Sequence, residues 1–299
     1  MRANIASALG ASAIVLLVAL LGFWLVRGSG DENEGTSAAG SGDEQTETAS
    51  SDENPDENSA GSDGRSDGTS ATSSSTTSVV TTTTIPARPA ETLSVGPVGE
   101  RVLLTFDAGA DVGFTQAILD TLERNEITAA FGITGMFAEE HPDLVVKIDE
   151  AGHTIINHSY DHGSATGFST NSGPLSFEER QEQLDLTEAA LEAAIGKGGR
   201  PWYRAPYGDV DDELLAQLGQ SGFSHYVRWS VDSLGWNGLT PAQIVQRCME
   251  RLEPGAIYLF HVGSRSGDAA ALQGIIDGLR ERNYGFATLE EMAGQPAQA

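Results

Sequence analysis

The sequence has 299 residues, a net charge of −26 and a hydrophobic content of 39%. This length suits one large domain or two small ones. A chain this acidic argues against nucleic acid and anionic lipid as binding partners. The average hides three unlike regions, which follow one another along the chain.

The N-terminal region is predicted to be a membrane anchor. The 24 residues from Ala3 to Val26 carry no charge, and a helix of that length spans about 36 Å, enough for a hydrocarbon core of ~30 Å. Arg2 precedes the segment and acidic residues follow Arg27, a weak bias that favours a cytoplasmic amino terminus. The alternative is a cleaved signal peptide, but no small-x-small site directly follows the apolar run. We therefore expect residues 1–27 to be an uncleaved anchor of a single-pass cell-membrane protein with its main domain extracytoplasmic, or secreted if this segment is cleaved.

The second region, residues 28–95, is predicted to be a disordered acidic linker. From Asp31 to Asp67 it holds 12 acidic residues and one basic residue, Arg65, and a Ser/Thr run follows from Thr69 to Thr84. Such a composition buries too little apolar area to offset the entropy of the chain. Self-repulsion should extend the segment, so we expect a tether.

The third region, residues 96–299, reads as a single α/β domain, because short apolar runs alternate with helical stretches. Strands are expected at 101–106, 127–133, 153–157, 203–205, 225–231, 256–260 and 286–289. Helices are expected at 114–125, 142–150, 177–195, 211–219, 241–252 and 269–282, with Gly196 ending the third of them. About seven strands with helices between most of them predict a distorted or incomplete parallel (β/α) barrel. His153, within one of these strands, is expected to be a core residue.

Polar side chains follow most of these strands, where catalytic groups of a parallel barrel are placed. The residues at these strand ends are Asp107, His158, His162, Arg204, Asp232 and His261. Any one of them alone is more often structural, but their recurrence at matching strand ends indicates one common site.

His158 and His162 are the candidate metal ligands. Two imidazoles four residues apart can lie on one face of a helical turn and bind one ion. Neutral imidazole is the commonest protein ligand for a transition metal. Two imidazoles with a carboxylate favour zinc.

Five motifs of the third region resemble, in order, those of the polysaccharide deacetylases, the NodB-homology group known as carbohydrate esterase family four. The motifs are Thr105-Phe-Asp-Ala-Gly109, His158-Ser-Tyr-Asp-His162, Arg204-Ala-Pro-Tyr-Gly208, Trp229-Ser-Val-Asp-Ser-Leu-Gly-Trp236 and Leu259-Phe-His261. The resemblance covers nearly all of residues 101–289. It implies a metal-dependent hydrolase that removes N-acetyl groups from an aminosugar polymer, here most simply peptidoglycan or a related envelope glycan.

The resemblance also implies a role for each motif residue. Asp107 matches the catalytic base, and Arg204 the residue that orients it. A metal on His158 and His162 would lower the pKa of its water and polarise the carbonyl. The remaining matches are the Tyr207 N–H as oxyanion donor, His261 as the acid for the leaving amine, Trp236 as the wall against the acetyl methyl, and Pro206 at the substrate.

The chain departs from the family pattern at two positions. Ala108 stands where the family usually has a third metal ligand; Asp111 is expected to replace it, the alternatives being Asp107 itself or water. Gly235 stands where the family often has an Asp that tunes the acid, and Asp232 is the nearby substitute. These losses leave open a non-catalytic glycan-binding relative. A hydrolase of small non-peptide amides is a further alternative.

Overall fold

The computed structural model describes residues 87–109 and 111–295, and the predicted anchor and most of the predicted linker lie outside them. Its strands are β1 (Glu91–Leu93), β2 (Arg101–Ala108), β3 (Ala130–Ile133), β4 (Thr154–Asn157), β5 (Trp202–Tyr203), β6 (His225–Val227), β7 (Val231–Asp232), β8 (Ile257–His261) and β9 (Gly285–Phe286). Its helices are α1 (Thr115–Arg124), α2 (Gly135–Glu140), α3 (Pro142–Glu150), α4 (Phe177–Ile195), α5 (Asp212–Gln220), α6 (Pro241–Glu250), α7 (Asp268–Glu281) and α8 (Leu289–Met292), with 3-10 turns η1 (Pro206–Gly208) and η2 (Gly235–Asn237).

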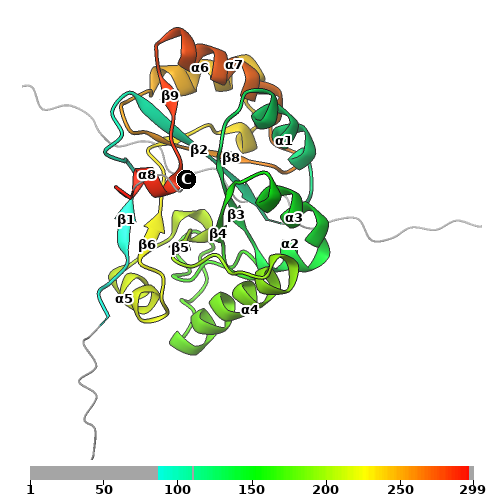
Figure 1. Ribbon diagram of the computed structural model, residues 1–299. Helices are drawn as coiled ribbons and strands as arrows, with labels where there is room; N and C mark the ends of the chain where they lie inside the picture. The colour runs from blue at the N-terminus through cyan, green and yellow to red at the C-terminus, as the bar shows by residue number, and fades with distance from the viewer. Residues whose placement is uncertain (1–86, 110, 296–299) are drawn as a thin grey trace, which may run out of the picture. The chain divides into compact units, whose positions relative to one another are not determined.

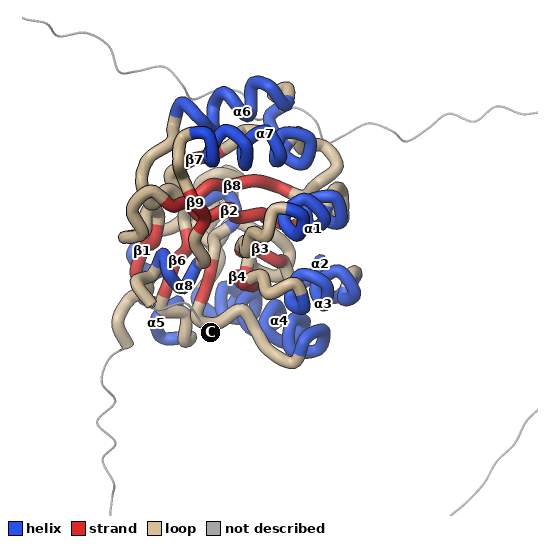
Figure 2. Tube along the Cα trace, turned by 45° about the horizontal axis from the view of Figure 1, so that its top comes forward, coloured by secondary structure: helices blue, strands red, loops and turns tan. Residues whose placement is uncertain are grey.

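The strands form one parallel sheet in the order β1-β6-β5-β4-β3-β2-β8-β7, and β9 pairs with the start of β2. Within the described residues no pairing joins β1 to β7, so the barrel is open along one side. Figures 1 and 2 show the strands at the centre with helices around them. The prediction of an incomplete parallel (β/α) barrel is therefore confirmed, with nine strands rather than about seven.

Alternation along each strand separates an outer core from the barrel interior, because successive side chains point to opposite faces. On β2, Val102, Leu104 and Phe106 pack outward in a cluster that also holds residues of α1, α3, α6 and α7. Leu103 of β2 instead joins the interior cluster. The same alternation directs Asp107, two residues beyond Thr105, toward the interior.

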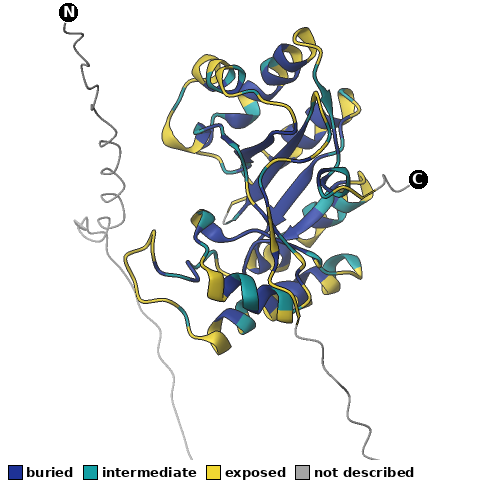
Figure 3. Cartoon of the chain, turned by 90° about the vertical axis from the view of Figure 1, so that its left-hand side faces the viewer, coloured by how far each residue is buried: buried dark blue, intermediate teal, exposed yellow. Residues whose placement is uncertain are grey.

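The N-terminal end of the barrel interior is filled with apolar side chains. Leu103, Trp202 and Ile257 from the strands pack there with Leu289 and Met292 of α8. Figure 3 shows the strands buried, while the helices carry exposed residues on their outer sides. The apolar filling of one end leaves the other end, at the carboxyl ends of the strands, to polar side chains.

The predicted starts of α4 and α6 and the predicted end of α4 are confirmed. Ser176 and Glu179 form a capping box before α4, and Gly196 ends that helix at a φ of 72°. Thr240 and Gln243 form a second capping box, with Pro241 in the first turn of α6. In both boxes a side-chain oxygen accepts a hydrogen bond from an N–H that the first turn leaves free.

The sequence prediction was wrong at four places. β1 pairs with β6 inside the range assigned to the linker, so the fold begins before residue 96. The last strand is β9 at residues 285–286, and residues 289–292 form α8. The expected strand at 225–231 is two strands, β6 and β7, which lie toward opposite edges of the sheet. Helix α2, which Thr134 caps by accepting from the N–H of Phe137, was not predicted.

The described residues include no helix that is both long and apolar enough to cross a membrane.

Candidate active site

The candidate residues meet at the carboxyl ends of the central strands, on the inner face of the barrel. Asp107 near the end of β2 pairs in register with His261 at the end of β8. His158 directly follows β4, and Arg204 directly follows β5. Parallel strands bring their carboxyl ends to one edge, so residues far apart in sequence converge there.

Asp107 lies between Arg204 and His158. Its Oδ1 accepts a hydrogen bond of 2.7 Å from Nη1 of Arg204, and its Oδ2 lies 3.5 Å from Nε2 of His158. Arg204 is fully buried and also donates from Nε to the carbonyl oxygen of Val227 at 3.1 Å. The guanidinium is therefore fixed by two strands and aimed at the carboxylate.

The environment of Asp107 keeps its carboxyl ionised. Burial opposes ionisation, but the charge of Arg204, with smaller contributions from His158 and His261 and a hydrogen bond from Arg204, holds the pKa of Asp107 below its ordinary value. An ionised carboxylate next to a site can accept a proton or bind a cation.

Gly132 makes room for this carboxylate, and sequence reasoning missed it. It is the register partner of Asp107 on β3. A Cβ atom at this position would overlap Oδ1 of Asp107 and lie 3.5 Å from the His158 ring. The sequence Ala130-Phe-Gly-Ile133 does place a glycine at an inward position. That this glycine faces Asp107 follows only from the register of β2 with β3.

His158 presents a free nitrogen to Asp107. Its Nδ1 lies 3.0 Å from the carbonyl oxygen of Arg204. Because a carbonyl only accepts, Nδ1 carries the proton and Nε2 holds a lone pair. Burial lowers the pKa of His158 and keeps the ring neutral. Within the described residues Nε2 is buried without a hydrogen-bond partner, so a lone pair and a carboxylate oxygen face each other across 3.5 Å.

His162 lies beside His158, but not on a helical turn as predicted. The segment after β4 is a loop, in which Ser159 and His162 have φ angles of 63° and 64°. The two imidazole centroids are 4.9 Å apart. Burial lowers the pKa of His162 to about 4, so this ring too is neutral near pH 7. The left-handed φ at His162 turns the chain back and brings the second ring to the first.

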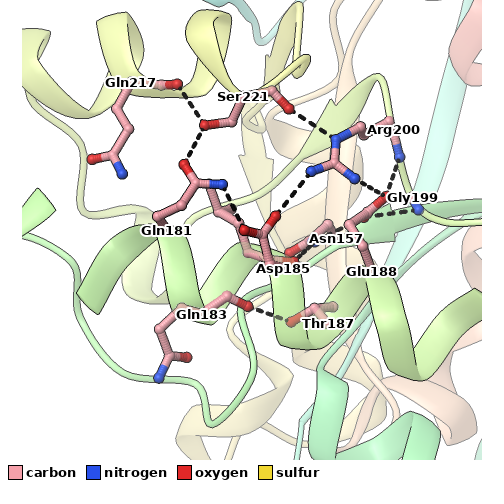
Figure 4. A network of polar contacts seen from close by, with 11 residues as sticks. Asn157, Gln181, Gln183, Asp185, Thr187, Glu188, Gly199, Arg200, Gln217 and Ser221 are labelled. Carbon is pink, nitrogen blue, oxygen red and sulfur yellow. Dashed lines mark hydrogen bonds and ion pairs between the residues drawn. The ribbon is translucent and has the colours of Figure 1, made fainter. Parts of the chain in front are cut away.

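A buried polar network supports this loop from the helix side (Figure 4). Asn157 points outward from β4, donates from Nδ2 to Oε1 of Glu188 at 2.9 Å, and accepts from the N–H of Ser159 at 3.1 Å. Glu188 of α4 also accepts from the N–H of Gly199 at 3.0 Å and from Nη1 of Arg200 at 3.0 Å. The network ties the residue before His158 to the segment that leads into β5 and Arg204.

Tyr207 and Pro206 lie in the turn η1, next to the histidines. Tyr207 has a φ of 60°, and its exposed ring lies 4.9 Å from the His162 ring. The N–H groups of Gly208 and Asp209 bond to Ala205 and Pro206, whereas the N–H of Tyr207 has no partner among the described residues. Pro206 is buried beneath the turn. The site therefore offers one free backbone donor at this rim.

His261 and Trp236 lie on the opposite side of the site. The His261 side chain is 30% exposed, and its backbone N–H donates to Oδ2 of Asp268 at 2.8 Å. Trp236, in η2, is 49% exposed. Asp268, a fully buried carboxylate beside His261, was not singled out from the sequence.

Asp111 does not join the two histidines in this structure. Its carboxylate accepts from the N–H of Ser264 at 3.0 Å and from the Ser264 hydroxyl at 3.1 Å, in the loop after β8. Ala108 is fully buried in the outer core. Among residues 87–109 and 111–295, no three or more His, Cys, Asp or Glu side chains are grouped so that they could hold a metal ion.

Comparison with known proteins places this domain. The family model for polysaccharide deacetylase matches residues 95–226. A peptidoglycan-N-acetylglucosamine deacetylase of Bacillus cereus is 33% identical over 201 residues, which cover 66% of this chain and 70% of the relative.

Two solved structures share the fold. A peptidoglycan N-acetylglucosamine deacetylase crystallised with a benzamide ligand matches with a TM-score of 0.63 and 30% identity, over 70% of this chain and 95% of that one. A pseudoenzyme of the same family, from Bacillus anthracis, matches with a TM-score of 0.61 and 28% identity, over 68% of each chain. On this similarity and the motifs, the chain belongs to the polysaccharide deacetylase family.

Proposed function

We propose that this protein hydrolyses N-acetyl groups on an aminosugar polymer of the cell envelope, peptidoglycan or a related glycan. The observation that carries the proposal is the convergence of three groups: an ionised Asp107, a free nitrogen on His158, and His261 in register with Asp107. The name of the B. cereus relative supports the choice of polymer.

Asp107 is the proposed general base. Hydrolysis of an amide needs a water molecule to lose a proton as it attacks the carbonyl carbon. The carboxylate is ionised, and Arg204 fixes its orientation through Oδ1, which leaves Oδ2 on the His158 side.

His158 and His162 are proposed to hold a divalent transition metal, zinc first. The donors fit such an ion: both rings are neutral, and the buried lone pair of His158 Nε2 faces Oδ2 of Asp107 with no protein donor between them. A cation there would relieve the repulsion of two electron-rich atoms. When bound, the ion polarises the amide carbonyl and lowers the pKa of a water molecule.

The remaining groups of the site are proposed to interact with the carbonyl oxygen, the leaving amine and the acetyl methyl group of the substrate. The free N–H of Tyr207 can donate to the carbonyl oxygen as it gains charge. His261 can protonate the amine as the C–N bond breaks. Trp236, half exposed in η2, can offer an apolar surface to the acetyl methyl group.

A groove beside Tyr207 supports a polymer as substrate. Its volume is about 810 Å³, and its lining includes Phe168, Tyr207 and Arg228. Phe168 is 81% exposed, yet its loop is fixed, because Ser164 and Ser169 donate three hydrogen bonds to the carboxylate of Asp209. An exposed aromatic ring on a fixed loop is a surface on which a sugar ring can pack.

One observation favours a second function, that of a non-catalytic glycan-binding protein. A relative of the same fold is described as a pseudoenzyme, and in this chain the third family ligand is replaced by the buried Ala108. The same groove would then bind the glycan without cleaving it.

Acetate release from N-acetylglucosamine oligomers and from peptidoglycan, with and without a chelator, tests the proposal. We expect release that the chelator stops and added zinc restores. A His158→Ala, His162→Ala double variant should lose both the activity and the bound metal. Binding of the oligomers without acetate release would establish the glycan-binding alternative, and release only from small amides would overturn the choice of polymer. Phe168→Ala should raise KM for long oligomers more than for short ones.

We also propose that residues 1–27 anchor the protein in the cell membrane with the domain outside. The sequence alone supports this proposal. Protease added to intact cells whose outer barriers have been removed should release the domain. A domain that protease reaches only after lysis would reverse the orientation, and a mature protein that starts beyond Val26 would show cleavage.

A further inference from the structure

Asp268 is a buried carboxylate next to His261. It is the first residue of α7, and it is fully buried. Its Oδ2 accepts from the backbone N–H of His261 at 2.8 Å and from the hydroxyl of Ser266 at 2.8 Å. The same oxygen lies 3.9 Å from Nδ1 of His261.

The side chains of His261 and Asp268 each retain an unused polar atom. Within the described residues, Nδ1 of His261 and Oδ1 of Asp268 are both buried without a hydrogen-bond partner. Buried polar atoms are nearly always paired, because leaving one unpaired costs free energy. Nδ1 of His261 lies 3.9 Å from Oδ2 of Asp268, which is beyond hydrogen-bond distance, so a side-chain movement is needed to pair the two groups.

Gly235 provides the space that this carboxylate occupies. A Cβ atom at Gly235 would overlap Oδ1 of Asp268 and lie 2.9 Å from Oδ2. The backbone holds the arrangement, since the N–H of Gly267 donates to the carbonyl oxygen of Gly235 at 3.2 Å. The carboxylate of α7 therefore occupies the volume that a side chain at position 235 would take.

Asp232, the substitute expected from the sequence, is engaged elsewhere. Its Oδ1 accepts from the N–H of Leu234 at 2.8 Å, within its own turn. Its carbonyl oxygen accepts from Nε of Arg247 at 2.7 Å. Asp232 thus shapes the turn before η2, and within the described part of the chain no hydrogen bond or ion pair joins its side chain to His261.

We propose that Asp268 is the positioning residue of the acid His261; the inference rests on the proposed deacetylase function. A carboxylate on the Nδ1 side favours the tautomer with the proton on Nδ1, and it stabilises the ring when it is doubly protonated. Nε2 is then the nitrogen that gives a proton to the leaving amine. Asp268 itself neither takes nor gives a proton in this step.

Burial raises the pKa of Asp268 above its ordinary value, and the hydrogen bonds from the His261 N–H and Ser266, together with the charge of His261, offset only part of this rise. A positive charge on His261 therefore favours the ionised form of Asp268. Asp107, which faces His261 from β2, adds a second negative charge to the same surroundings.

The test compares Asp268→Ala with Asp268→Asn in the full-length protein. Asp268→Ala removes the acceptor and should lower kcat on N-acetylglucosamine oligomers about 100-fold, with KM within about twofold. Asp268→Asn keeps the oxygen that accepts from the His261 N–H and removes only the charge, so a loss of about 10-fold is expected. Asp277→Asn, at an exposed position of the same helix, is the matched control and should change kcat little.

Two further measurements separate positioning from folding. Hydrolysis of 4-nitrophenyl acetate, whose leaving group needs no proton, should change less than threefold in both variants. Gly235→Asp combined with Asp268→Ala should recover part of the lost kcat, because it returns a carboxylate to the same space. Equal losses on amide and ester would overturn the proposal and assign Asp268 a structural role.

Nitrogen NMR of the His261 ring tests the inference independently of turnover, with the signal assigned by its loss in His261→Gln. The wild type should show the proton on Nδ1, and Asp268→Ala should shift the tautomer toward Nε2. An unchanged tautomer would overturn the role of Asp268. An inactive wild type with the expected tautomer change would instead overturn the deacetylase proposal and leave the positioning of His261 standing.

Discussion

Two positions that the motif resemblance marks as departures from the family pattern, Ala108 and Gly235, are resolved differently. At Gly235 the missing side chain is replaced in space by Asp268, which α7 brings to His261. After Asp107 no such replacement is seen: Ala108 is buried in the outer core, and Asp111 is bound by Ser264. One departure is filled by another carboxylate of the same chain, and the other is not.

The difference shows which interactions determine whether an acidic side chain lies in the site. Asp111 and Asp232 are the nearest acidic residues in sequence, yet each is captured by an N–H in its own surroundings, that of Ser264 or of Leu234. Asp268 comes from a separate segment and is oriented by the N–H of His261 and the hydroxyl of Ser266. Local N–H donors, rather than closeness in sequence, determine which carboxylate reaches the site.

The sharpest test of the comparison is the pair Asp107→Asn and Asp111→Asn. Because Asp107 faces His158 and Asp111 does not, Asp107→Asn should weaken zinc binding and lower acetate release about 10²–10⁴-fold, while Asp111→Asn should stay near wild type in both. Zinc titration and acetate assays on the two purified variants measure this. If Asp111→Asn alone loses the metal, the loop moves when the ion binds and both departures are filled. Equal affinity in both variants would mean that neither carboxylate binds the ion.

A second test uses the two glycines that make room for carboxylates. Gly132→Ala would overlap Oδ1 of Asp107, and Gly235→Ala would overlap Oδ1 of Asp268. Overpacking of this kind typically costs about 1–3 kcal/mol. We expect both variants to lose stability in thermal unfolding. Gly132→Ala should lose more kcat, because it displaces the base rather than a residue acting through the acid; the reverse order would contradict the roles assigned here.

The smallest expected effect concerns His153, which lies away from both places and provides a control for acid unfolding. Its Nδ1 accepts from the N–H of Ala129 at 3.2 Å, and burial lowers its pKa from 6.5 to about 4. The unfolded chain therefore binds this proton more readily, so stability should fall as the pH drops from 6.5 to 4, by at most about 3 kcal/mol.

His153→Asn should flatten this part of the pH–stability curve, measured by urea unfolding of the full-length protein at several pH values. Losses of activity at low pH that persist in this variant can then be assigned to the site. An unchanged slope would mean that His153 is already protonated in the fold or that other groups dominate acid unfolding.

Much of the fold could be predicted from residue periodicity. The apolar strands and amphipathic helices predicted the barrel, and the positions of Asp107 and His261 directly after apolar strands predicted that both lie at one end of it. The short strand β1 was missed because Glu91-Thr-Leu93 has no apolar run and is stabilised by pairing with β6. The last strand was predicted at 286–289, too far toward the C-terminus, and α8 was missed because it is a single turn that the capping box at Thr288 begins.

The site was predictable as a set of motifs, but not in its supporting contacts. The loop that brings His162 to His158 depends on left-handed φ angles at two non-glycine residues, which no pattern in the sequence signals. Gly132 leaves room for Asp107 of the neighbouring strand, and Asp268 accepts a hydrogen bond from the N–H of His261. Their importance appears only once the register of β2 with β3, and the approach of α7 to η2, are known.

The position of β2 has a consequence for the order in which the chain assembles. Its partner β3 follows closely in sequence, but its other neighbours, β8 and β9, come from residues 257–261 and 285–286. Until they are synthesised, one edge of the central strand has unpaired N–H and C=O groups, which invites association with other chains. The proposed base and acid, paired in register across β2 and β8, meet only when this long-range pairing closes, so partly made chains should carry no deacetylase activity.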